Sequence, residues 1–121
     1  MIFIESIEFK TIELPNIATL WYYFKMDRRE YKVSLIINAV KVTKVIIDPH
    51  YEEKHAESIN DEIILELVKT LDGKYFEPDD VKGHYAYFVT DQIEYRQKNY
   101  RLIWLLEENE IYIGVINAYR R

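Results

Sequence analysis

The sequence has no cysteine, only three glycines and three prolines, and no hydrophobic run near the ~20 residues that a transmembrane helix requires. Without cysteine, disulfides, thiolate metal ligands and a cysteine nucleophile are excluded. The scarcity of glycine and proline leaves no visible linker or repeat, which indicates a single domain over residues 1–121. The N-terminus, MIFIESIEFK, lacks the basic region of a signal peptide. We therefore expect a soluble, cytoplasmic protein with no membrane contact.

The composition is that of a folded domain with an acidic surface. Of its 121 residues, 49% are hydrophobic and 15% aromatic, which is enough for a core. The net charge of −5 argues against a simple polyanion binder. Most of this acidity lies within residues 49–82, so the two ends can still present basic surface. No phosphate-binding loop, nucleophile elbow or metal-binding motif occurs, and we expect no metal or cofactor.

The first half of the chain changes from strands to helices near residue 48. Residues 1–30 read as an extra β element, with strands expected at 2–10 and 17–26 and a polar turn at 27–30. A β-branched strand is expected over 31–47. Asp48 and Pro49 are typical of a helix start and predict a short helix over 49–56. A second helix over 60–72 is capped by Ser58 or Asn60 and ended by Gly73.

The second half predicts a loop and three antiparallel strands. Residues 74–83 read as the loop and 84–91 as a strand that continues or turns within 92–98. Two further strands, over 99–107 and 111–120, flank the turn ENE and form a hairpin. This order predicts an α+β fold: an antiparallel sheet with the two helices packed on one face.

Strand alternation places a charge among apolar residues in this hairpin. Arg101 shares a strand face with Ile103 and Leu105. A charge there is costly unless it is paired or lines a groove. Two uses remain open, a salt bridge to a helix carboxylate such as Glu62 or Glu66 and a phosphate clamp. On the partner strand, the residues expected on one face are Asn117, Tyr119 and Arg121.

Two of the three histidines lie five residues apart in the first helix. On a regular helix, a rotation of about 100° per residue points His50 and His55 in different directions, roughly 140° apart. His50 then shares a face with Lys54. The spacing is poor for a metal site, and an ordinary solvent-exposed or packed histidine remains the alternative for each. His84 is expected to be an ordinary residue at a loop edge.

Two segments carry a resemblance to a known family. The end of the chain, NYRLIW…EIYIGVINAYRR, resembles the C-terminal hairpin of the RelE/ParE toxin superfamily. The segment HYEEKH, residues 50–55, is similar to the helical histidine segments of the nucleases grouped with barnase, EndoU, colicin D and RelE (the BECR fold). The resemblance covers roughly residues 31–121. It implies a small metal-independent endoribonuclease, the toxin of a toxin–antitoxin system, that cleaves RNA by attack of the 2′-OH.

The resemblance also implies partners and roles. RNA, free or ribosome-bound, and a cognate antitoxin protein are the implied partners. His50 or His55 would act as acid or base, with Lys54 and Arg101 as cations for the transition state and Tyr119 beside them. Base stacking on tyrosine with cations on phosphates is physically reasonable at the hairpin. The substrate-binding candidates are Tyr95, Arg96, Lys98, Asn117, Arg120 and Arg121.

Two other functions fit the same sequence. A non-catalytic interaction module would bind a basic partner through its acidic helices, or would form a homodimer through the N-terminal strands. A small-molecule binder would enclose an aromatic cavity around Trp21 and Trp104.

Overall fold

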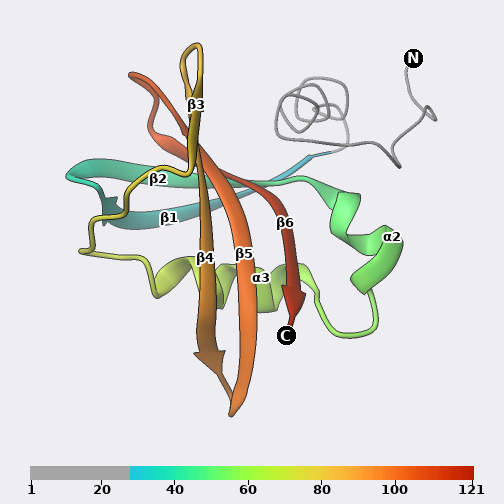
Figure 1. Ribbon diagram of the computed structural model, residues 1–121. Helices are drawn as coiled ribbons and strands as arrows, with labels where there is room; N and C mark the ends of the chain where they lie inside the picture. Colours follow the sequence, from blue (N-terminus) through green and yellow to red (C-terminus); the bar gives the residue numbers. More distant parts are fainter. Residues whose placement is uncertain (1–27) are drawn as a thin grey trace, which may run out of the picture.

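The computed structural model describes residues 28–121, and the strands expected at 2–10 and 17–26 lie outside this described part. Residues 28–121 form an α+β fold in which six strands make a curled sheet in the order β1-β2-β6-β5-β4-β3, with short helices beside it (Figure 1). The elements are β1 Arg29–Ile37, β2 Val40–Ile47, the 3-10 turn η3 Pro49–Tyr51, α2 Glu52–His55, α3 Asp61–Lys69, β3 Asp80–Lys82, β4 Tyr85–Tyr95, β5 Lys98–Glu107 and β6 Tyr112–Arg120.

The segment expected as one strand over 31–47 is a hairpin, β1 and β2, so that expectation was wrong. Asn38 and Ala39 form its two-residue turn with positive φ angles of 54° and 64°. Two-residue turns of this kind favour Asn followed by Gly. Because alanine stands at the second position, the sequence has no clear turn signal within this β-branched segment. β1 also begins at Arg29, inside the stretch expected to be a polar turn.

The helix starts were predicted correctly. The Asp48 side chain accepts a hydrogen bond from the His50 backbone N–H at 2.9 Å, and Pro49 opens η3, which continues into α2. Asn60 caps α3 by accepting from the Ile63 N–H at 2.8 Å. Gly73 follows the helix with a φ of +78°. The helix itself ends at Lys69, three residues short of the expected end.

The sheet contains one parallel pair, which corrects the expectation of an antiparallel sheet. β2 runs parallel to the first half of β6, where Ile47 pairs with Val115. The chain between these two strands contains the helices and then β3 to β5, and a parallel pairing requires such a long connection in place of a tight turn. Where β2 ends, η3 and α2 carry the chain on beside the second half of β6 (Figure 1).

The main core lies between α3 and one face of the sheet. Ile64, Leu67 and Val68 of α3 are buried there against Trp104, which is fully buried in β5. Phe88 stacks on the indole with ring centroids 4.0 Å apart. Trp104 is thus a core residue packed against another ring, and Trp21, the other residue of the expected aromatic cavity, lies outside the described residues. Of the two helices expected on this face, α3 covers it, while α2 lies beside β6.

The last two strands follow the sequence predictions closely, and the segment between α3 and β4 does so except for one short strand. The loop expected over 74–83 contains the short strand β3, which pairs with the start of β4 around a turn at Gly83. The β5–β6 hairpin agrees with its prediction to within one residue at each boundary. In residues 28–121, no helix has the length and apolar character needed to cross a membrane.

Candidate functional site

Tyr119 and Arg101 lie side by side on neighbouring strands. They are paired in the β5–β6 register, and alternation places both on the sheet face opposite α3. The Arg101 Nη1 donates a hydrogen bond to the Tyr119 hydroxyl at 3.1 Å. The guanidinium carbon lies 5.8 Å from the centre of the tyrosine ring, within the range of a cation–π contact. The phenol is therefore held against a positive charge.

His55, the last residue of α2, completes this cluster. Its ring stacks on the Tyr119 ring, with centroids 4.9 Å apart and planes 25° from parallel. Burial lowers the pKa of His55 below its ordinary value of 6.5, and the positive charges of Lys54 and His50 lower it further. The neutral imidazole, which can accept a proton, is thus the dominant form at neutral pH.

Arg101 forms a salt bridge, but not with the helix carboxylates expected from the sequence. Its Nη2 lies 2.7 Å from the Asp91 Oδ2 on the neighbouring strand β4. Glu62 and Glu66 belong to α3, which covers the opposite face, so the expectation of a helix partner was wrong. The Arg121 Nη1 lies 3.7 Å from the same Asp91 oxygen. Arg101 and Arg121 are therefore linked through one carboxylate, and Tyr119 joins the group through its hydrogen bond with Arg101.

The other residues of the histidine segment have different surroundings. The segment is not one regular helix but a 3-10 turn followed by α2, so the rotation argument does not apply across it. The His50 Nδ1 lies 3.4 Å from the Glu53 Oε2. Lys54 is exposed.

Four of the six substrate-binding candidates gather elsewhere, at a hollow of about 370 Å³. They belong to the β4–β5 turn with its flanking strand ends and to the end of β6, and the start of α3 with the segment before it lines the other side of the hollow. The Arg96 guanidinium lies over the Tyr95 ring, 5.2 Å from its centre. The lining side chains include Tyr95, Arg96, Lys98, Tyr100 and Arg120 on one side and Glu57, Ser58, Asn60 and Glu62 on the other.

The predicted residues are thus divided by strand alternation. Arg120 points to the α3 face, where it lines the hollow, and Tyr119 points to the opposite face. Asn117 shares the face of Tyr119 and uses its side-chain oxygen to accept from the Ala118 N–H at 2.9 Å. Tyr119 and Arg120 both lie near the end of β6, on opposite faces of the sheet.

Asp91 is the member of the site that the sequence did not indicate. Within TDQ it reads as an ordinary polar strand residue, and its partner Arg101 is ten residues away. The available signal was the interruption of apolar alternation at Asp91 and Gln92. That interruption corresponds to a bulge, because the β4–β5 register shifts between Thr90 and Ile93.

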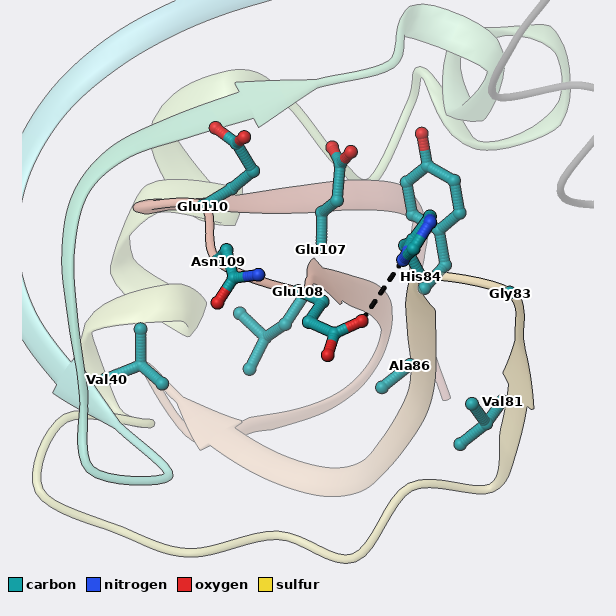
Figure 2. Close-up of a pocket in the computed structure, with 11 residues that line it drawn as sticks. Val40, Val81, Gly83, His84, Ala86, Glu107, Glu108, Asn109 and Glu110 are labelled. Carbon is teal, nitrogen blue, oxygen red and sulfur yellow. Dashed lines mark hydrogen bonds and ion pairs between the residues drawn. The ribbon is translucent and has the colours of Figure 1, made fainter.

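A second hollow, of about 500 Å³, lies at the other end of β5. Figure 2 shows His84 and Glu108 directed at each other across it, with His84 Nδ1 3.1 Å from Glu108 Oε1. Glu107, which also lines it, accepts a hydrogen bond from the Tyr112 hydroxyl at 2.6 Å. Glu107 lies six positions along β5 from Arg101, which is about 20 Å at the usual rise of a strand. His84 is therefore remote from the His55 cluster.

Among residues 28–121, no group of three or more histidine and acidic side chains is arranged to hold a metal ion. Comparison with known proteins adds no assignment, since no family model, no curated protein and no solved structure matches this chain.

Proposed function

We propose that this protein is a small endoribonuclease that cleaves RNA without a metal ion, using the cluster of His55, Tyr119 and Arg101. The observation that carries the proposal is the convergence of these three side chains from three separate elements, α2, β5 and β6. The His55 ring contacts the Tyr119 ring, and the Tyr119 hydroxyl accepts a hydrogen bond from Arg101. A proton acceptor, a phenol and a cation held together are the groups that attack by a 2′-OH requires.

The geometry favours a role for each side chain. Neutral His55 takes the proton of the 2′-OH as that oxygen bonds to phosphorus. Arg101 stabilises the charge that develops on the phosphoryl oxygens. Tyr119 accepts from Arg101 and keeps its own O–H proton, which it donates to the departing 5′-oxygen. The products are a 2′,3′-cyclic phosphate and a 5′-hydroxyl end, and Lys54 supplies a further positive charge beside His55.

The hollow beside Arg120 provides a binding position for a neighbouring nucleotide. Arg96 is exposed and its planar guanidinium lies over Tyr95, so a base can stack on its outer surface. Lys98 and Arg120 provide cations for the adjacent phosphate. The strand of RNA would pass from this hollow across the end of β6 to Arg101.

The arrangement of elements supports the resemblance to RelE/BECR toxins. One strand, β2, is followed by α2 and α3 and then by three consecutive antiparallel strands, β4 to β6, with β3 and β1 added at the two edges. The proposal accordingly includes a cytoplasmic site of action and a cognate antitoxin protein. Co-expression of the antitoxin would relieve growth inhibition caused by the active protein.

The proposal is tested with the purified chain on single-stranded RNA and on ribosome-bound messenger RNA, with analysis of the product ends. We expect His55→Ala to lower the cleavage rate about 10²- to 10⁴-fold. Arg101→Ala should lower it about 10²- to 10³-fold. Tyr119→Phe keeps the ring against His55 but removes the hydroxyl. A lower cleavage rate in this variant therefore measures the contribution of the O–H group and not of the ring contact.

His84→Ala is the matched control, because it removes a histidine at the remote end of β5. It should retain the parental rate. The proposal fails if the parent leaves both RNA substrates intact, or if His55→Ala and Arg101→Ala cleave as fast as the parent.

A second function, a non-catalytic interaction module, is favoured by one observation. Exposed carboxylates gather along α2 and the turn after it, at Glu52, Glu53 and Glu57, where a basic protein surface could bind. Lysine replacements at Glu53 and Glu57 would then abolish partner binding while leaving the His55 cluster in place. Binding without any RNA cleavage by the parent would favour this function over the nuclease.

A further inference from the structure

Asp91 belongs to a bulge that lies directly opposite Arg101. Thr90 pairs with Leu102 and Ile93 with Tyr100, so Asp91 and Gln92 together face one residue of β5. Gln92 has a positive φ of 57°, and its N–H donates to the Asp91 Oδ1 at 2.9 Å. One carboxylate oxygen is therefore held by the bulge, and the other is presented to the arginines.

That second oxygen is contacted by two guanidinium groups. The Asp91 Oδ2 lies 2.7 Å from the Arg101 Nη2 and 3.7 Å from the Arg121 Nη1. The Arg121 backbone is fixed as well, since its N–H donates to the Asn99 carbonyl at 2.8 Å. Two arginines that converge on one oxygen anion form the arrangement by which proteins bind phosphate.

We propose that Arg101 and Arg121 form a phosphate-binding site that Asp91 occupies as an internal competitor, so that an RNA phosphate binds by displacing the Asp91 carboxylate. The inference rests on the proposed function and adds the position and the regulation of its phosphate subsite. A phosphodiester carries the same charge as the carboxylate and offers two unbridged oxygens, one for each arginine.

The ion pair of Asp91 with Arg101 differs from that of Asp61 with Arg29, which has the contacts of a structural ion pair. Asp61 accepts from Arg29 and also from the hydroxyls of Tyr31 and Tyr51, and its side chain is 15% exposed. The Asp91 side chain is 35% exposed, and its contacts outside the bulge are those to the arginines. An exposed pair of this kind contributes little to stability, so an incoming anion can replace it.

The buried donor of Arg101 supports the same inference. Its Nε is buried and has no hydrogen-bond partner among the residues that the structure describes. Asp91 thus leaves the guanidinium incompletely bonded. A phosphate group, with more acceptor oxygens than the one that Asp91 presents, can satisfy more of these donors when the site rearranges around it.

The test measures binding rather than cleavage. Asp91→Asn keeps the local hydrogen bond from Gln92 but removes the competing charge. Binding of inorganic phosphate and of a 2′-deoxy oligonucleotide, which has no attacking hydroxyl, is followed by NMR titration and fluorescence anisotropy. We expect Asp91→Asn to bind both probes about five- to tenfold more tightly than the parent, and the double variant with Arg101→Ala to lose this gain.

Asp80→Asn is the matched control. Asp80 also accepts from the N–H of the next residue, at 2.9 Å, and pairs with a cation, Lys82, at 3.8 Å, but it belongs to β3. An affinity of Asp91→Asn equal to that of the parent or of Asp80→Asn overturns the inference. If Asp91→Asn binds the probes more tightly while no variant cleaves RNA, the phosphate site stands and the nuclease proposal fails. If the parent cleaves RNA but Asp91→Asn binds the probes no more tightly than the parent does, the nuclease proposal stands and the phosphate-site inference fails.

Discussion

The ring of His55 lies on the ring of Tyr119, with centroids 4.9 Å apart, although 64 positions separate the two residues in the chain. The contact follows from the parallel pairing of β2 with the first half of β6, because η3 and α2 then continue beside the second half. A histidine and a tyrosine that are remote in sequence thereby become neighbours beside Arg101.

The first prediction concerns the protonation of His55. Burial, followed by the charges of Lys54 and His50, lowers its pKa below 6.5. Replacing Tyr119 with leucine removes the ring that covers the imidazole, so the pKa should rise toward 6.5. Titration of the histidine carbon-bound protons by NMR measures this change. An unchanged midpoint in Tyr119→Leu would show that the contact does not desolvate His55.

The same shift has a consequence for stability. At a pH between the folded pKa and about 6.5, the unfolded chain binds more protons at this site than the folded chain. The contribution of His55 to the free energy of unfolding therefore falls as the pH drops through that window. We expect the free energy of unfolding to fall less with decreasing pH in His55→Gln than in the parent, and urea unfolding at several pH values measures this difference.

The second prediction concerns the Asp61 network, which joins β1 to the start of α3. Burial alone would raise the pKa of Asp61, but hydrogen bonds from Arg29, Tyr31 and Tyr51 outweigh it and lower the pKa to about 2. Asp61→Asn should reduce the free energy of unfolding by about 2 kcal/mol, because three donors lose a charged acceptor. Urea unfolding measures this change.

Glu62→Gln is the control for Asp61→Asn, since it removes an exposed charge from the same helical turn and should have little effect. The pH dependence gives a second check. The stabilisation by Asp61 is complete above the ordinary pKa of 3.8 and is lost as the pH falls through about 2. Equal acid sensitivity of the parent and Asp61→Asn would contradict this account of the network.

The third prediction concerns the β1–β2 turn. Ala39 has a φ of 64°, a left-handed conformation in which its Cβ is strained. Ala39→Gly removes the strain at some cost in unfolded-chain entropy, and should raise the free energy of unfolding by roughly 0.5–1 kcal/mol. Ala86→Gly, near the start of β4 and paired with both β3 and β5, should instead lower it. A loss of stability in both variants would show that the turn is unstrained.

Local chemistry in the sequence was sufficient for several elements. Asp48 and Pro49 indicate the start of a helix from local chemistry alone, because the side-chain cap and the fixed proline φ act over two or three residues. Asn60 and the apolar spacing that follows it define α3 in the same way. Strand alternation likewise placed Arg101 and Tyr119 on their faces, since successive side chains of a strand point in opposite directions.

Which of these residues meet depends on the pairing and packing of the strands. The parallel β2–β6 pair brings His55 to Tyr119, and the β4 bulge turns Asp91 toward Arg101. The interrupted alternation at Asp91 and Gln92 indicates the bulge, but nothing local identifies the partner of Asp91 or of His55, because strand order and register are set by how the whole core closes around α3. The candidate chemical groups and the strand faces that carry them follow from the residue order alone. The packing of the sheet decided that His55, Tyr119 and Arg101 form one cluster and that Arg120 lies on the other side.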